Sequence, residues 1–507
     1  MSTLAGAFTA RGGHSPVVGA SAVVAFLAAA LLGVATLPAQ APDRSEPPEL
    51  GPPPDFDLPP IQRFHLSNGL EVMLLEKHQV PLVQIHLVVD AGSIRDPEGK
   101  KGLASMAAAM LDEGAGERDA LALADAIDYL GADLGISAGE HTTVVRLHTP
   151  LARLDPALEI MADIALRPTF PAEELERQRI ERLTTLLQWR DEPRAIAAVA
   201  FAETLYGEIH PYGVPAIGTA EGLQSITPED LSDYHAAHFR PGNATLIVVG
   251  DVTGGTLSPL LEAAFGAWNG GSVTAAGLPA AGVPPAEQVE ARHVTLIDKP
   301  GAAQSEIRIG RIGVPRLTDD YYSILVMNTI LGGSFTSRLN QNLREDKGYS
   351  YGAFSAFDFR PGPGPFLAAA AVQTEVTAEA LTEFMRELTG ILEAVTETEL
   401  ERARNYLALG FPQEFQTVAG TAGMLGELAV YDLPDDTFDR YIERVQAVTV
   451  ADVQRVARQY LDPEKVAIIV VGDREVVEAP IRALDLGPVE VRTIEEALGP
   501  PPVVSVP

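Results

Sequence analysis

The feature that most constrains this chain is an internal repeat with a period as long as a domain. The segment ITPEDLSDYHAAHFRPGNATLIVVGDV (226–252) returns as VTVADVQRVARQYLDPEKVAIIVVGDR (448–474). Four pairs of identical residues stand 222 positions apart in the two copies: Thr227 and Thr449, Pro241 and Pro463, Gly250 and Gly472, Asp251 and Asp473. Each copy has the pattern of a threonine N-cap, an amphipathic helix, a proline turn and a β-branched strand. The repeat predicts two homologous α+β domains rather than a solenoid of short units.

A second pair of segments extends the repeat and helps to mark its boundaries. EELERQR (173–179) corresponds to TELERAR (398–404), with Glu174 and Glu399 standing 225 positions apart. A few inserted residues therefore separate the two registers. Segments rich in Pro, Gly and small residues predict linkers between the blocks. We divide the chain into a leader at 1–41, a Pro-rich linker at 42–60, a first domain at 61–268, a linker at 269–291, a second domain at 292–490 and a loose tail at 491–507.

Within the first block, the hydrophobic pattern predicts strands and helices that face one another. GLEVMLLEKH and LVQIHLVVDAGS read as two paired strands around a turn at 79–81, followed by an Ala-rich helix within 99–116. The remaining predicted elements are a helix at 119–130, a strand at 136–149, and helices at 155–166 and 172–190. In each domain we expect a mainly antiparallel sheet covered by one layer of helices.

Composition excludes several classes of function. The chain has 507 residues, with 37 Lys and Arg against 69 Asp and Glu, which gives a net charge of −32. Such a negative surface disfavours non-specific binding to nucleic acid or anionic lipid. There is no cysteine, so disulfides, thiolate zinc sites and cysteine nucleophiles are excluded.

The N-terminal segment predicts export. Arg11 precedes an apolar run from Val17 to Leu37, and Ala39-Gln40-Ala41 follows as a cleavage site. This pattern is typical of a secretory signal peptide. The run spans 21 residues, so an uncleaved membrane anchor is the alternative. We expect a periplasmic or extracellular protein that contacts a membrane only through this segment.

From about residue 61 to 480 the chain resembles the insulinase/pitrilysin family of metallopeptidases, which includes the mitochondrial processing peptidases. The resemblance is carried by NGLEVMLLEKHQVPLVQIHLVVDAGSIRDPEGKKGLA and ERLTTLLQWRDEP, then by HPYGVPAIGTAEGLQSITPEDL and FRPGNATLIVVGDV, and in the second half by LGGSFTSRLNQNLREDKGYSY. It implies two duplicated domains that form a clam-like half-chamber.

The family's zinc motif is missing from the helix that should carry it. The inverted motif H-x-x-E-H aligns with Ser105-Met106-Ala107-Ala108-Ala109. Counting back from Pro193 places the third ligand at Thr185. The resemblance thus implies that the four positions Ser105, Ala108, Ala109 and Thr185 are no longer ligands, and that this chain holds no cofactor of its own.

Histidines elsewhere do not replace the lost ligands. His235 and His238 stand three apart on a predicted helix, where surface or capping roles are expected. His141 and His148 stand seven apart on the predicted strand 136–149, hence on opposite faces. We expect neither pair to bind zinc.

One catalytic element of the family is retained. Arg344 and Tyr351 in LREDKGYSYGAF match an Arg/Tyr pair that family members bring to the zinc site from the C-terminal half. Gly332 and Gly333 before it predict a tight turn at a helix end. The strand 136–149 corresponds to the family's peptide-binding edge, although Gly135 replaces the family's common Asn.

Two hypotheses of different class follow, with a stand-alone peptidase using an unrecognised site as a distant third. The first is a catalytically silent subunit that supplies Arg344 and Tyr351 in trans to a zinc-bearing partner of the same family, which cleaves peptides. In that case the zinc belongs to the partner. The second is a non-enzymatic scaffold or peptide-binding protein of the same fold.

Overall fold

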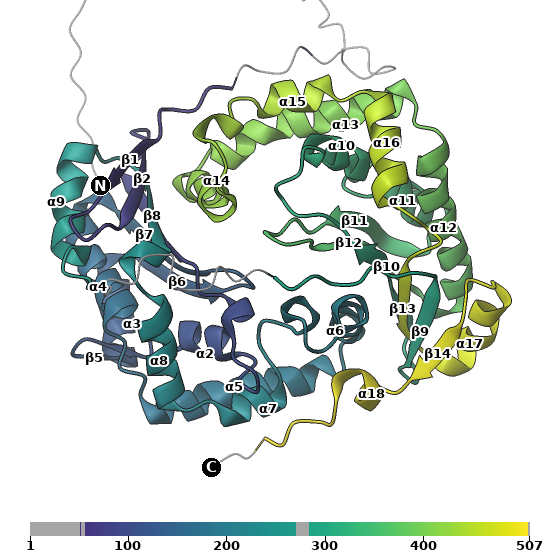
Figure 1. Cartoon of the computed structure of the whole chain (residues 1–507), viewed down its shortest axis with the longest axis horizontal. Coiled ribbons are helices and arrows are strands. Elements are labelled where there is room, and N and C mark those ends of the chain that lie inside the picture. Colours follow the sequence, from purple (N-terminus) through teal and green to yellow (C-terminus); the bar gives the residue numbers. More distant parts are fainter. Residues whose placement is uncertain (1–50, 52–55, 270–282, 505–507) are drawn as a thin grey trace, which may run out of the picture. The chain divides into compact units, whose positions relative to one another are not determined.

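The computed structural model describes residue 51, residues 56–269 and residues 283–504 (Figure 1). The signal peptide expected at 1–41, most of the linker expected at 42–60 and residues 270–282 of the second linker lie outside this range. From residue 56 onward the described residues belong to one unit, Pro53–Pro507. No helix in the described part of the chain is both long and apolar enough to cross a membrane.

The first half builds a six-stranded sheet and a small two-stranded ribbon. Its strands are β1 (Gln62–His65), β2 (Glu71–Glu76), β3 (Leu82–Val89), β4 (Gly114–Ala115), β5 (Arg118–Asp119), β6 (Asp133–Ala138), β7 (Thr143–Pro150) and β8 (Ala244–Gly250). Its helices are α2 (Leu103–Ala109), α3 (Ala120–Leu130), α4 (Leu154–Leu166), α5 (Ala172–Trp189), α6 (Pro193–Tyr206), α7 (Ala220–Ser225), α8 (Pro228–His238) and α9 (Gly254–Phe265).

The strand order corrects two expectations. The order is β1-β2-β8-β3-β7-β6, so β8 lies between β2 and β3, and the predicted hairpin does not form. β8 pairs in parallel with β2 and antiparallel with β3. The single strand expected at 136–149 is instead β6 and β7, which pair antiparallel around a turn at 139–142.

The second half repeats this topology. Its strands are β9 (His293–Asp298), β10 (Gln304–Ile312), β11 (Ser350–Phe357), β12 (Pro365–Gln373), β13 (Ala467–Gly472) and β14 (Val489–Arg492). Its helices are α10 (Tyr321–Leu331), α11 (Arg338–Asn340), α12 (Thr377–Glu393), α13 (Glu397–Gly410), α14 (Val418–Tyr431), α15 (Tyr441–Ala447), α16 (Val450–Tyr460), α17 (Arg474–Ala483) and α18 (Ile494–Leu498). The order β14-β9-β13-β10-β12-β11 resembles that of the first sheet, and β9 is parallel to β13 as β2 is to β8. The edge strands differ, because β14 is parallel to β9 whereas β1 is antiparallel to β2. The expected pair of mainly antiparallel α+β halves is confirmed.

Each sheet is covered on both faces, which corrects the expected single helical layer. The run ATLIVVG of β8 is apolar on both faces, so both faces need a cover. The helices of the first half pack on one face, and α14 of the second half packs on the other, against β8 and β3. In the second half, α6 of the first half packs against β13 and β10 in the same way (Figure 1).

Parts of the expected linkers and tail are ordered where they carry apolar residues. Phe56 packs against the rings of Phe411 and Phe415, and the backbone N–H of Leu58 donates to Asp439 Oδ1 at 3.2 Å. Val283 and neighbouring apolar residues of the second linker pack beside α6. The segment 491–507 begins inside β14 and continues into α18, so its first residues are not a loose tail.

Candidate functional site

The helix α2, which carries three of the four candidate zinc positions, begins at a constrained glycine. Gly102 has φ of 101°, a left-handed value that favours glycine, and its backbone N–H donates to Asp96 Oδ2 at 2.7 Å. Asp96 Oδ1 accepts from the backbone N–H of Ala104 at 2.8 Å. Burial raises the pKa of Asp96 to about 6. The buried carboxyl thus orients the first turn of α2.

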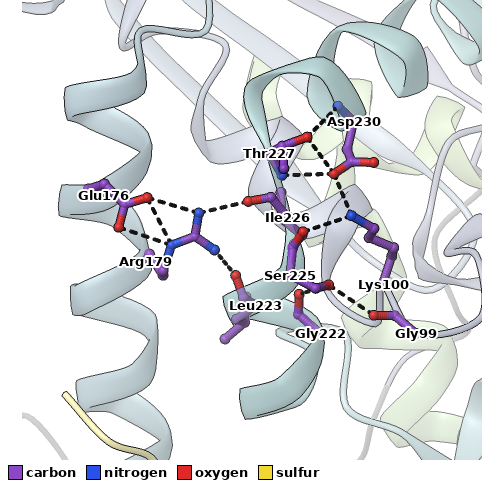
Figure 2. Close-up of polar contacts among 10 residues, drawn as sticks. All are labelled: Gly99, Lys100, Glu176, Arg179, Gly222, Leu223, Ser225, Ile226, Thr227 and Asp230. Atoms are coloured by element: carbon purple, nitrogen blue, oxygen red, sulfur yellow. Dashed lines mark hydrogen bonds and ion pairs between the residues drawn. The ribbon is translucent and has the colours of Figure 1, made fainter. Parts of the chain in front are cut away.

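A polar network anchors the segment that leads into α2 (Figure 2). Lys100 Nζ donates to the carbonyl of Ser225 at 2.7 Å and to Asp230 Oδ2 at 2.6 Å. Ser225 Oγ donates to the carbonyl of Gly99 at 3.0 Å. Arg179 on α5 donates to the carbonyl of Ile226 at 2.7 Å, so α5 is tied to the same junction between α7 and α8. These hydrogen bonds fix the segment before α2 to α7 and α8.

The four candidate positions do not fit a zinc ion. Ser105 Oγ accepts a hydrogen bond from Arg182 at 2.9 Å, and Thr185 Oγ1 donates to the carbonyl of Glu181 at 3.1 Å. Ala108 and Ala109 offer only methyl groups. Zinc sites in proteins use His, Cys, Asp or Glu ligands, and none of the four is one of these. The described residues contain no group of three or more such side chains placed to hold a metal ion.

The guanidinium of Arg182 joins α5 to α2, a contact that no sequence motif indicated. Arg182 on α5 donates to both the hydroxyl and the carbonyl oxygen of Ser105, each at 2.9 Å. Burial lowers the pKa of Arg182, and its Nε–H has no acceptor among the described residues. Arg182 lies seven residues after the buried Leu175 on the same helix face. That spacing was the signal that an arginine points inward here.

The four histidines are placed away from any shared metal position. His235 Nε2 is 2.9 Å from the carbonyl of Ala165, and His148 Nδ1 is 2.9 Å from Gln84 Oε1. Burial lowers the pKa of His238 to about 4, and its Nδ1 has no hydrogen-bond partner in the described part of the chain. His141 lies in the turn between β6 and β7 rather than on a strand, with Nε2 2.5 Å from Tyr212 Oη.

Arg344 and Tyr351 are brought together in the second half. Arg344 lies on a turn of π-helix, η5 (Gln341–Asp346), and Tyr351 lies on the edge strand β11. The Arg344 guanidinium carbon is 4.9 Å from the Tyr351 ring centroid and 4.7 Å from that of Phe335. Arg344 Nε is also 3.2 Å from Glu345 Oε1. Tyr351 is 87% exposed and Phe335 59% exposed, so these aromatic side chains face solvent. We call Arg344, Tyr351 and Phe335 the Arg344 group.

Phe335 belongs to the Arg344 group, although the Arg/Tyr motif in the sequence does not include it. It follows Gly332 and Gly333, which form the expected turn at the end of α10, where both backbone N–H groups donate to the carbonyl of Asn328. Within the described residues, no hydrogen bond or ion pair links the Arg344 group to the four zinc-motif positions. The structure therefore has two separate groups, one in each half.

The edge of the first sheet lies beside α2. Among the described strands, β6 is terminal and pairs only with β7, so one side of its backbone is free to pair. Helix α2 contacts β6. A Cβ atom at Gly135 would meet no atom within 4 Å. An extended peptide can add to such an edge through main-chain hydrogen bonds.

Comparisons with known proteins place the chain in a family. The family "Insulinase (Peptidase family M16)" matches residues 71–213, and "Peptidase M16 inactive domain" matches residues 225–407. The uncharacterized zinc protease YmxG of Bacillus subtilis is 24% identical over 402 residues, which cover 79% of this chain and 95% of YmxG. A peptidase M16 inactive domain from Pseudomonas fluorescens has a TM-score of 0.76 and 27% identity, covering 82% of this chain and 98% of that one.

A chain of complex III2 from Candida albicans has the same fold, with a TM-score of 0.68 and 15% identity over 83% of this chain and 99% of that one. The two family matches lie in order along the chain, each in one half, and together span more than half of its length. This protein is therefore a member of the insulinase family, peptidase family M16.

Proposed function

We propose that this protein is a catalytically silent subunit of an exported zinc endopeptidase, and that Arg344 and Tyr351 serve the zinc site of a partner subunit from the same family. One observation carries the proposal: the metal positions are filled by Ser105, Ala108, Ala109 and Thr185, while the Arg344 group remains assembled and exposed. A chain that kept only its fold would have no need of an exposed tyrosine beside an arginine.

The chemistry of the pair suits this role. A guanidinium and a phenol both donate hydrogen bonds, and both can stabilise a substrate carbonyl oxygen as it gains negative charge. The Tyr351 hydroxyl has no hydrogen-bond partner among the described residues, so its proton is available. The ring of Phe335 and the carboxylate of Glu345 hold Arg344 beside Tyr351. Because Ser105, Ala108, Ala109 and Thr185 cannot hold a metal, the pair would act on a substrate that a zinc-bearing partner positions.

The relatives support both parts of the proposal. YmxG is described as a zinc protease, the Pseudomonas fluorescens structure as an inactive domain, and the Candida albicans chain belongs to a larger complex. A division between a metal-bearing chain and a silent chain fits all three descriptions. Export rests on the leader pattern at 1–41, and fractionation of the tagged chain in its host tests it.

The decisive experiment uses Tyr351→Phe in a complex with a family member that carries an intact H-x-x-E-H motif. Loss of one oriented donor typically costs about 10²–10³ in kcat, so we expect the variant to slow peptide cleavage by that factor. Assembly and zinc content of the complex should not change. Tyr129→Phe, at an 80% exposed tyrosine on α3, is the matched control and should leave kcat unchanged. Equal kcat for the wild type and Tyr351→Phe would rule the proposal out.

The free edge of β6 beside α2 favours a second candidate, a peptide-binding scaffold. In that case the purified chain should bind extended peptides without a partner. The Gly139 N–H donates to the carbonyl of Thr142, and donors alternate along a strand, so the N–H of Ala138 points to the open side of β6. Ala138→Pro, which removes this donor from the edge, should weaken the binding. Peptide binding with no effect of Tyr351→Phe on any partner's turnover would favour the scaffold.

A further inference from the structure

A pocket in the second half, which includes neither Arg344 nor Tyr351, has the chemistry of an anion site. It has a volume of about 660 Å³. One wall is the segment 316–322 that leads into α10, and the other is the segment 433–444 that leads from the end of α14 into α15. We call it the arginine pocket, because Arg316, Arg440 and Arg444 line it.

Arg316 is buried against an aromatic ring, and the N–H donors of its side chain have no acceptor among the described residues. Arg316 is 8% exposed, and its guanidinium carbon lies 3.5 Å from the ring centroid of Tyr321. Its backbone N–H donates to the carbonyl of Arg360 at 2.8 Å. In the described part of the chain, its side chain has no hydrogen bond and no ion pair. A guanidinium stacked on an aromatic ring keeps its N–H edge free for a bidentate oxyanion.

The opposite wall supplies two further guanidinium groups. Arg440 and Arg444 stand one helical turn apart, with the backbone N–H of Arg444 donating to the carbonyl of Arg440 at 2.9 Å. Arg440 pairs with Asp436 at 2.6 Å, whereas the Arg444 side chain is exposed and makes no ion pair with any described residue. Two of the three cations in the arginine pocket thus lack a carboxylate partner within the described residues.

The lining of the arginine pocket carries fewer carboxylates than guanidinium groups. Asp319 and Asp436 are the acidic residues of the lining, and Asp436 is already bound to Arg440. Behind the wall, burial raises the pKa of Glu427, and Arg316 opposes that shift. Burial raises the pKa of Tyr321 to about 12, so its phenol stays neutral. Three arginines against two aspartates is an unusual balance in a chain with 37 basic and 69 acidic residues.

We propose that the arginine pocket binds a small oxyanion, either a phosphate group or a pair of carboxylates. Its volume lies within the range of about 300–1,000 Å³ that is usual for small-ligand sites. Arg316 offers a pre-oriented fork, and Arg444 can close on the ligand from the opposite wall. The site is independent of peptide cleavage, and it adds a ligand to the function proposed above.

Calorimetric titration of the full chain tests this site, with inorganic phosphate and succinate as the probes and sodium chloride at matched ionic strength as the blank. The double variant Arg440→Gln/Arg444→Gln changes only exposed side chains, so it should fold. We expect saturable binding of at least one probe to the wild type, and a rise in Kd of about tenfold or more for the double variant. The matched control Arg153→Gln/Arg386→Gln removes two exposed arginines elsewhere and should keep the wild-type Kd.

The two probes also distinguish the source of the ligand. Binding of phosphate alone identifies a phosphorylated ligand, binding of succinate alone identifies a dicarboxylate, and binding of both identifies a general oxyanion site. Arg316→Lys keeps the charge but loses the fork, and it should weaken binding further if the bidentate contact forms. The proposal is wrong if neither probe binds saturably, or if the double variant and the control variant bind equally well.

Discussion

Arg182 places a positive charge beside Ser105, one of the four positions at which the sequence resemblance predicts the family's zinc motif. Its two terminal nitrogens hold Ser105 on α2, while Thr185 lies one turn further along the same face of α5. The guanidinium of Arg182 therefore joins α5 to α2 at the predicted zinc-motif positions. A zinc ion entering here would meet like charge at close range.

This arrangement predicts the outcome of restoring the motif. Ser105→His, Ala108→Glu, Ala109→His and Thr185→Glu together should not give stoichiometric zinc binding while Arg182 remains. Adding Arg182→Val removes the cation and continues the apolar face of Leu175, so the fivefold variant should bind one zinc per chain. Metal analysis after dialysis against a weak chelator measures both. Equal zinc content in the fourfold and fivefold variants would contradict the role given to Arg182.

His86 gives a second prediction at the scale of one residue. It lies on β3, is 7% exposed, and burial followed by the charge of Arg146 lowers its pKa to about 4. The unfolded chain takes up this proton near the ordinary value of 6.5. The stability that comes from neutral His86 is therefore fully present above that value and is lost as the pH falls towards 4.

His86→Gln removes the titrating ring and isolates this effect. The difference in unfolding free energy between wild type and variant should shift in favour of the variant by up to about 3 kcal/mol between pH 7 and pH 4. Urea unfolding of both proteins across this range measures the shift, and the difference at pH 7 gives the packing contribution. A difference that does not change with pH would show that His86 titrates alike in both states.

At the scale of elements, the entry into α2 depends on a close backbone contact with α7. A Cβ atom at Gly222 would lie 2.2 Å from the carbonyl oxygen of Lys101, the residue before Gly102. Gly222→Ala should therefore destabilise the protein by about 1–3 kcal/mol, although alanine is normally the better helix former. Gly423→Ala is the matched control, because Gly423 is also helical and a Cβ atom there would meet nothing within 4 Å. It should stabilise by about 0.5–1 kcal/mol.

Thermal and urea unfolding of the two variants measure whether each substitution raises or lowers the free energy of unfolding. Stabilisation by both substitutions would show that α7 and the segment before α2 move apart easily. In that case the network in Figure 2 would not position α2.

Local patterns predicted helices better than they predicted strand partners. The helices expected at 119–130, 155–166 and 172–190 match α3, α4 and α5 to within one residue at each end, because their periodicity and end signals are local. β2 and β3 were expected to pair because they are adjacent in sequence. Their true partner β8 begins only at Ala244, far along the chain, and no local signal records that insertion.

The candidate site shows the same limit at its own scale. Arg344 and Tyr351 were recognisable because one short motif contains both. The contact of Arg182 with Ser105 joins residues 77 positions apart and follows only from the packing of α2 against α5. The pairing of His141 with Tyr212 arises from a turn that the strand pattern concealed.

At the scale of the whole molecule, the two halves exchange helices in matching positions. α6 runs from Pro193 to Tyr206 and α14 from Val418 to Tyr431, so both of their ends are 225 residues apart, the same offset as Glu174 and Glu399. Each helix covers the sheet of the other half. The apolar strands β8 and β13 need this second cover, and neither half supplies it from its own described helices.

This exchange makes the stability of the first sheet depend on residues of the second half. Leu425 on α14 is fully buried with Ile247 and Val249 of β8, and Leu425→Ala should cost about 2–5 kcal/mol. We expect the loss of hydrogen-exchange protection to include β8, although the substitution lies in the other half.

Leu388→Ala on α12 is the control, because Leu388 is equally buried but lies in the second half's own core. It should reduce protection in β12 more than in β8, since α12 contacts β12. If both substitutions reduce the protection of β8 equally, the exchanged helix has no specific role, and the two sheets are coupled only through global unfolding.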